Sequence, residues 1–145
     1  MKRHQIESLL ISALLVSGCM SVARLSDLPR SSDQVNFKQV TKDEYGHYEH
    51  DFVLTGVTDQ QFHAIVRKAM DSNGYSVRTD EVKSRATTGE RGLRLNTWGA
   101  VAGVYSRRTG DSLDVKVIVR ITQDFTGTLP ERFAEDIANE IKKSL

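Results

Sequence analysis

Cysteine is almost absent from this 145-residue sequence, which holds one, at position 19. A single cysteine excludes an internal disulfide, so Cys19 needs another explanation in an exported chain. An excess of one charge is also lacking, because 20 Lys and Arg residues face 19 Asp and Glu residues. The overall charge therefore predicts no preference for nucleic acid or for a membrane surface. The length suits a single domain, and apolar residues make up 39% of the chain, which is below the globular average but outside the disordered range.

Motifs for catalysis are lacking as well. The sequence has no glycine-rich phosphate loop, and no pair of carboxylates stands in an apolar setting. His47 and His50 are three residues apart in an expected strand, so they point to opposite faces and make a poor metal site. His63 is expected on the polar side of a helix. We predict no enzymatic activity, no metal and no catalytic residue.

Long hydrophobic runs are absent too. The longest apolar run at the N-terminal end covers residues 9–16, whereas a membrane-spanning helix needs ~20 apolar residues. Lys2 and Arg3 precede this run, and the small residues Ser17 and Gly18 follow it. A basic start, a short apolar stretch and small residues at the end are typical of a secretory signal. We assign residues 1–18 to a signal peptide.

Residues 15–19 read Leu-Val-Ser-Gly-Cys. This segment resembles the lipobox of bacterial lipoproteins, in which an aliphatic residue, a small residue and Gly or Ala precede an obligatory cysteine. The resemblance implies cleavage between Gly18 and Cys19, diacylglycerol on the Cys19 sulfur and an acyl chain on its amine. We expect no cofactor besides this lipid. Because Met20 and Ser21 follow, rather than aspartate, the resemblance implies the outer membrane of a Gram-negative envelope, facing the periplasm.

Residues 19–44 show scattered apolar residues with no period of 2 or 3.6. Such a segment cannot bury enough surface to fold alone, so we expect a flexible, lipidated tether. About 20 flexible residues let a domain stand ~25 Å from the bilayer. The alternative is that part of this segment packs on the domain as an edge strand, with Val35, Phe37 and Val40.

The folded domain is expected over residues 45–145, with a strand over 48–57 and then a helix. Thr58 and Gln61 form a capping-box pattern at the start of this helix. Its apolar residues fall on one face at helical spacing, and Asn73-Gly74 supplies the stop.

Further strands are expected over 75–79, around 82–88, over 97–107 and over 112–122. The last of these alternates aliphatic with mostly charged residues, which predicts one face on a core and the other facing water. A second helix begins near Thr128, which forms a capping box with Glu131.

These elements predict an α+β domain: a two-layer sandwich in which two amphipathic helices cover one face of an antiparallel sheet of about four strands. The order is β-α-β-β-β-α. This order over residues 48–145 resembles the helix-grip-type domains of some small outer-membrane lipoproteins, including the C-terminal domains of BamC in the β-barrel assembly machine. A ferredoxin-like arrangement is the alternative.

Basic residues outnumber acidic ones by nine to five between Arg78 and Arg120. One reading is a patch for an anionic partner such as lipid headgroups, peptidoglycan or an acidic protein. This patch would consist of Arg85, Arg91, Arg94, Arg107 and Arg108. The other reading is the ordinary solvated side of a sheet.

Two functions remain open from the sequence. The first is a membrane-anchored envelope lipoprotein whose domain acts as a non-enzymatic protein-interaction or assembly accessory module. The second is an envelope ligand-binding module for an anionic lipid or a cell-wall fragment. A cavity of ligand size would favour the second function, and a solid core would remove it.

Overall fold

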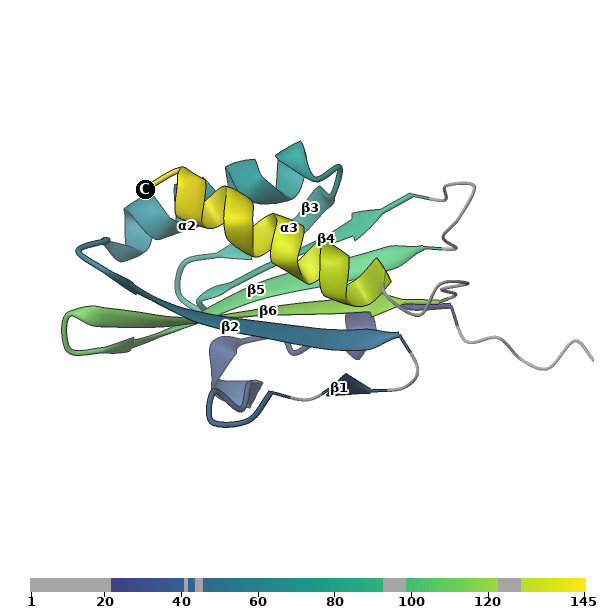
Figure 1. Cartoon of the computed structure of the whole chain (residues 1–145), viewed down its shortest axis with the longest axis horizontal. Helices are drawn as coiled ribbons and strands as arrows, with labels where there is room; N and C mark the ends of the chain where they lie inside the picture. The colour runs from purple at the N-terminus through teal and green to yellow at the C-terminus, as the bar shows by residue number, and fades with distance from the viewer. Residues whose placement is uncertain (1–21, 41, 44–45, 93–98, 123–128) are drawn as a thin grey trace, which may run out of the picture.

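The computed structural model describes residues 22–40, 42–43, 46–92, 99–122 and 129–145 (Figure 1). Two short 3-10 helices come first, η1 (Leu25–Asp27) and η2 (Ser32–Gln34). The later elements are β1 (Lys42–Asp43), β2 (His47–Thr55), α2 (Asp59–Ser72), β3 (Ser76–Glu81), β4 (Ala86–Arg91), β5 (Ala100–Thr109), β6 (Ser112–Ile121) and α3 (Leu129–Lys143).

The described strands form one antiparallel sheet in the order β1-β2-β6-β5-β4-β3. The α+β class is therefore confirmed, but the sheet has more than the expected four strands. One addition is β1, which contributes two residues at the edge of β2. The strand expected around 82–88 is present as β4 but starts only at Ala86, because residues 82–85 form the turn after β3.

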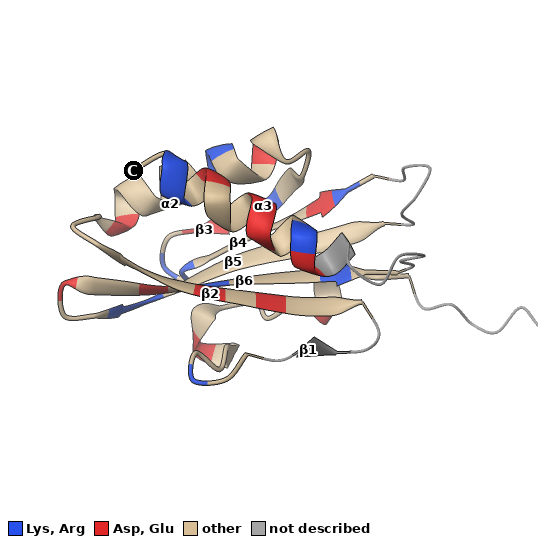
Figure 2. Ribbon diagram, viewed as in Figure 1, with Lys and Arg blue, Asp and Glu red and all other residues tan. Residues whose placement is uncertain are grey.

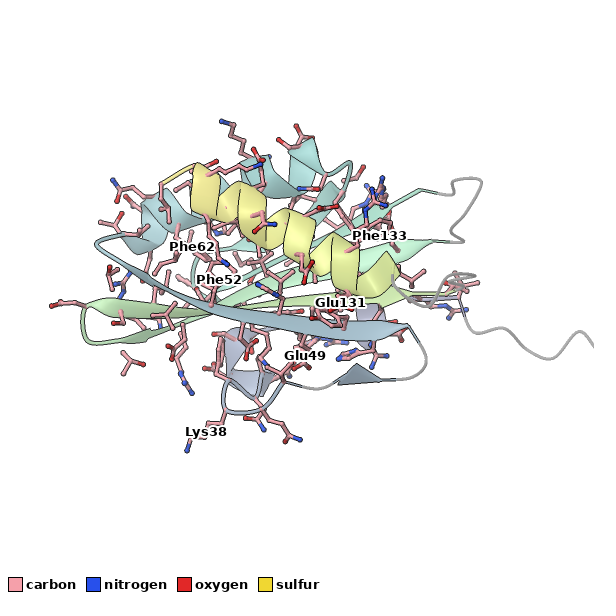
Figure 3. All side chains as sticks on the ribbon, in the orientation of Figure 1. Lys38, Glu49, Phe52, Phe62, Glu131 and Phe133 are labelled. Carbon is pink, nitrogen blue, oxygen red and sulfur yellow. The ribbon has the colours of Figure 1, made fainter. Side chains whose placement is uncertain are left out.

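Both helices lie on one face of the sheet, as the sequence predicted (Figure 1). Their apolar stripes pack on the aliphatic face of β6 and its neighbours, and Phe62 lies in this layer (Figure 3). The capping box of α2 is present: Thr58 Oγ1 accepts from the Gln61 amide, and Gln61 Oε1 accepts from the Thr58 amide. The helix ends at Ser72, and Gly74, just beyond it, has a φ of +77° that favours glycine.

The opposite face of the sheet does not face water throughout. Residues 22–40, which we call the strap, run beneath it (Figure 1). Leu28 of the strap is 4% exposed and packs in a second apolar cluster with Val101, Tyr105 and Ile118. The Ser32 amide also donates to the backbone oxygen of Ser84. The prediction of a flexible tether over 19–44 is therefore wrong for residues 22–40.

The packing alternative for this segment comes closer, but its details differ. Val35 and Phe37 do pack against the second cluster, whereas Val40 is 47% exposed. None of these three residues is in a strand. They cross the face of the sheet instead of extending its edge.

Tyr105, on β5, binds the strap through a hydrogen bond from its hydroxyl group. Its ring lies over Gly103, where a Cβ atom would come within 2.6 Å of the ring carbon Cε2. Because glycine lacks this atom, the ring can lie flat along the sheet. Its hydroxyl then donates to the backbone oxygen of Pro29 at 2.8 Å. Gly103 thus makes room for the side chain that binds the strap.

Removing this hydroxyl should loosen the strap measurably. We expect Tyr105→Phe to lower the free energy of unfolding by about 1 kcal/mol, because Pro29 would keep a carbonyl without its donor. Tyr75→Phe is the matched control, since the buried Tyr75 hydroxyl makes no hydrogen bond to the described residues. Urea unfolding of both variants measures the difference. Equal losses in the two variants would contradict the assigned role of Tyr105.

Candidate functional site

The expected lipidation residue, Cys19, and the cleavage residue Gly18 lie outside the described residues. The description begins at Val22, three positions after the cysteine. The structure therefore leaves the lipid anchor as a sequence prediction.

Two arginines of the expected anionic-partner patch converge on one carboxylate. Arg108 Nη2 lies 2.6 Å from Asp59 Oδ1 and also donates to the Val57 backbone oxygen at 2.7 Å. Arg85 Nη2 lies 3.8 Å from the other Asp59 oxygen. Asp59 is in the first turn of α2, so these contacts connect the start of that helix to β5 and to the β3–β4 turn. Both arginines are already paired with this carboxylate.

Arg107 is engaged in a similar way. Its Nη2 lies 2.9 Å from Asp114 Oδ2, across the β5–β6 pair. Its guanidinium also lies over the ring of Phe37, 4.8 Å from the centroid, and so covers part of the strap. A cation over an aromatic face is attracted by the ring. Arg107 therefore has a structural role at this end of the sheet.

Arg91 lies at the other end of β4, and Arg94 lies outside the described residues. Six residues of strand separate Arg91 from Arg85, which corresponds to about 20 Å. The Arg91 guanidinium stacks over Phe133 of α3, 4.7 Å from the ring centroid. The four described arginines thus do not form one patch, and the expectation of a single anionic site over them is wrong. These arginines are close together along the chain, but their partners Asp59, Phe37 and Phe133 lie on other elements.

A buried charge cluster on β2 and β6 was not predicted. We call Lys116, Glu49 and Asp51 the Lys116 cluster. The Lys116 side chain is 0% exposed, and its Nζ lies 2.7 Å from Glu49 Oε2 and 3.2 Å from Asp51 Oδ2. It donates a third bond to the Gln39 backbone oxygen at 2.6 Å, which satisfies all three ammonium donors. Glu49 points toward the strap side of the sheet (Figure 3).

Lys116 binds the C-terminal part of the strap through the Gln39 backbone oxygen, and Tyr105 binds its middle through the Pro29 backbone oxygen. The sequence placed Lys116 on a water-facing side of β6, which is wrong because residues 36–40 cover it. No local signal marks this burial, since the covering residues lie 77 positions away in the chain. A fully buried lysine needs such partners, because an unpaired buried charge is strongly unfavourable.

The environment of Asp51 in this cluster disfavours its ionised form. Burial raises the pKa of its carboxyl above the usual 3.8, although Lys116 acts in the opposite direction. One of its oxygens, Oδ1, is buried without a hydrogen-bond partner among the described residues. The ionised form of Asp51 is therefore less favourable in the folded protein than in the unfolded chain.

This raised pKa predicts a pH dependence. The folded protein binds a proton at Asp51 more tightly than the unfolded chain does, so the Asp51 contribution to stability increases as the pH falls through the raised pKa toward 3.8. We expect the stability of the wild type relative to Asp51→Asn to increase over this window. Urea unfolding of both proteins from pH 7 to pH 4 tests this. A difference that shrinks as the pH falls would contradict it.

The histidines occupy opposite faces, as strand geometry predicted. His47 accepts from Arg120 at Nδ1 and contacts Glu49 through Nε2 at 3.1 Å, on the strap side. His50 faces the helix layer, where burial, aided by Lys142, lowers its pKa. Among the described residues, no group of three potential metal ligands occurs.

His63 has a polar environment that the sequence did not predict. Its Nε2 lies 2.5 Å from Asp80 Oδ1, which also accepts from Thr87 Oγ1 at 3.1 Å. Arg67 contacts the second Asp80 oxygen, so Asp80 connects α2 to β3 and β4. The adjoining hollow, which His63 and Ser106 help to line, has a volume of about 10 Å³. This is the space of one water molecule and too little for a substrate.

A larger depression lies between α2 and the edge of the sheet at β3. We call it the α2–β3 groove; it is an open concavity of about 560 Å³ lined by Ala64, Arg67, Lys68, Asp71 and Val77. β3 is the last strand in the sheet order and pairs with β4. Its outer edge therefore presents backbone donors and acceptors beside the groove.

Comparison with known proteins gives no assignment, because no family model and no curated protein matches this sequence. Within the described residues, the helices are too short or too polar to cross a membrane.

Proposed function

We propose that this protein is an envelope lipoprotein, anchored through lipid on Cys19 in the outer membrane and facing the periplasm. Its domain binds another envelope protein and catalyses no reaction. The observation that carries the anchor is the segment Leu15–Cys19, which begins at the end of the apolar run and contains the sole cysteine in the chain. Two or more acyl chains on that residue give stable membrane attachment, where one chain binds marginally.

The α2–β3 groove supports a protein partner. An exposed strand edge next to a helix suits an extended peptide, which adds to the sheet through backbone hydrogen bonds and places alternate side chains in the groove. Val77 offers the groove an apolar contact, and Arg67, Lys68 and Asp71 offer charges of both signs. The proposed occupant is an extended segment of another envelope protein.

The alternative of a ligand-binding module receives less support. Ligand sites are concave spaces of ~300–1,000 Å³ that enclose most of the ligand. The hollow beside His63 is far smaller than this range, at about 10 Å³. The α2–β3 groove has the volume but is open to solvent. Its mixed charges also offer an anionic lipid no uniform attraction.

The order of the elements after β1, with both helices on one face, is compatible with a helix-grip-type domain. We propose this relationship to other outer-membrane lipoprotein domains as well. It agrees with an accessory role in an assembly machine, since such domains are compact modules held at a membrane.

The anchor is tested by replacing Cys19 with serine. We expect the wild type to incorporate labelled palmitate and to fractionate with outer membranes, and Cys19→Ser to do neither. A Cys19→Ser protein that still fractionates with membranes would contradict the lipid anchor.

The groove is tested with a photo-crosslinking amino acid at Lys68 in intact envelopes. We expect one reproducible adduct from this position, and its loss when Val77→Asp is added. Asn139, exposed on α3, is the matched control position and should give no such adduct. Identical adducts from Lys68 and Asn139, or none from either, would contradict a partner site in the groove.

A further inference from the structure

We infer that the end of the sheet where the strap begins is held against the phospholipid surface. Four arginines at this end, Arg24, Arg91, Arg120 and Arg132, meet anionic headgroups there. We call this end the proximal end. The inference rests on the proposed lipid anchor and adds a fixed placement of the domain, which the sequence did not predict.

The short connection between Cys19 and the strap keeps the proximal end close to the lipid. Val22 lies three positions after Cys19, and three fully extended residue steps span about 11 Å. The next residue is already fixed, because the Ala23 amide donates to Thr122 Oγ1 at 2.6 Å. A tether of about 20 residues would allow ~25 Å and free rotation. The strap removes that freedom, so the end of β6 stays close to the acyl chains.

The proximal end is the end of the sheet at which β6 finishes and β5 begins. Ile121 pairs with Ala100, so the end of β6 and the start of β5 lie together there, beside Thr122 and Ala23. The turn that joins β5 to β6 lies at the other end, about 30 Å away along ten residues of strand. Figure 1 shows the strap beginning at the end opposite this turn. The β5–β6 turn therefore points away from the membrane.

The arginines at the two ends of the sheet differ in their partners. The arginines at the far end are paired with carboxylates, Arg107 with Asp114 and both Arg85 and Arg108 with Asp59. The proximal arginines differ. Among the described residues, Arg24 and Arg91 have no carboxylate within 4 Å, and Arg120 contacts His47 instead. Arg132 is 74% exposed and lies 4.0 Å from Asp136.

The described acids near the proximal end are engaged elsewhere. Glu90 pairs with Arg78, Asp27 accepts from the Arg24 backbone amide and Glu131 accepts from the Tyr48 hydroxyl. Figure 2 shows arginines and acidic residues interspersed at this end, and none of the four proximal guanidinium groups has a described carboxylate closer than 4.0 Å. Anionic headgroups attract such positive charge within a Debye length of the surface. Reach and charge thus select the same occupant, an anionic phospholipid surface.

The test uses the full lipidated protein in vesicles of known composition. Lipid blocks the Cys19 sulfur, so an engineered cysteine is the sole labelling site. Gly92→Cys places a fluorophore at the proximal end, where a Cβ atom meets nothing within 4 Å, and Asp111→Cys places one at the far end. We expect much stronger energy transfer to headgroup acceptors from position 92 than from position 111, matching a path about 30 Å shorter. Equal transfer from both positions would overturn the inference.

Charge is tested separately. We expect Arg24→Gln combined with Arg132→Gln to weaken the transfer from position 92 in vesicles containing phosphatidylglycerol. Arg85→Gln with Arg107→Gln makes the same charge change at the far end and should have no effect. Equal energy transfer from position 92 in the two double variants would contradict the contacts between the proximal arginines and the headgroups.

Mass measurement of the purified protein shows independently whether Cys19 carries lipid, so a failed anchor is distinguished from a failed orientation. Cys19→Ser protein then tests the surface alone. We expect it to sediment with phosphatidylglycerol vesicles at low salt more than with phosphatidylcholine vesicles, and to lose this difference at ~1 M salt. Equal sedimentation with both lipids would overturn the charge contact.

Discussion

Replacing Lys116 by methionine is expected to lower the free energy of unfolding by about 3–5 kcal/mol. Methionine has a similar volume, so the loss comes from charge: Glu49 and Asp51 would remain close together beneath the strap without their cation. Because the Asp51 side chain keeps 28% exposure, we expect a value in the lower part of that range. Urea unfolding at pH 7 measures it.

Two controls separate charge from packing. Lys68→Met removes an exposed lysine and should change stability by less than about 0.5 kcal/mol. Adding Glu49→Gln and Asp51→Asn to Lys116→Met removes the uncompensated charges, so it should recover much of the loss. A triple variant as unstable as Lys116→Met would show that charge pairing is not the cause.

Truncating Leu28 to alanine should produce the second large effect. Leu28 is the strap residue buried deepest against the sheet, and we expect a loss of about 2–5 kcal/mol, as for other buried leucines. The strap should also become accessible to proteases before the rest of the domain unfolds, because its remaining contacts are fewer. Val22→Ala, at a position 50% exposed, is the matched control and should be near neutral.

Limited proteolysis locates this effect. Cleavage within residues 22–40 of Leu28→Ala, at protease concentrations that leave the wild type intact, is the expected result. A Leu28→Ala protein that is fully stable and uncut would mean that the strap contributes nothing to the fold.

The helices and β6 were predictable because their signals are local. Each signal is formed by residues that are close together in the sequence: the capping box at Thr58, the stop at Gly74 and the aliphatic alternation of β6. Such patterns specify an element without knowledge of its neighbours. The layer of two helices on one face followed from them directly.

The strap was not predictable, because its contacts are distant in the sequence. Leu28 packs on Val101 and Ile118, and the Pro29 oxygen accepts from Tyr105, 76 positions away. Read alone, residues 22–40 are polar and lack a period, which is also the pattern of a linker. The sheet face that contacts the strap contributes few apolar residues to the second cluster: Ala86, Val101, Tyr105 and Ile118. Their pattern in the sequence did not predict a second core.

The arginines failed as a predicted site for a related reason. Charge counting over residues 78–120 excluded Asp59, which precedes that range and neutralises Arg85 and Arg108. The groove between α2 and β3 was missed as well, since strand order decides which strand is at the edge. Sequence gives no direct signal for that order.

Amide hydrogen exchange of the strap tests most directly whether residues 22–40 belong to the folded domain. The Ser32 amide donates to Ser84 at 2.9 Å and the Val35 amide to Ser32 at 3.0 Å. If the strap is part of the fold, the Ser32 and Val35 amides will exchange far more slowly than in an unfolded chain, and Leu28→Ala will remove this protection. Exchange of both amides at unfolded-chain rates in the wild type would contradict the packed strap, and with it the short connection to the membrane.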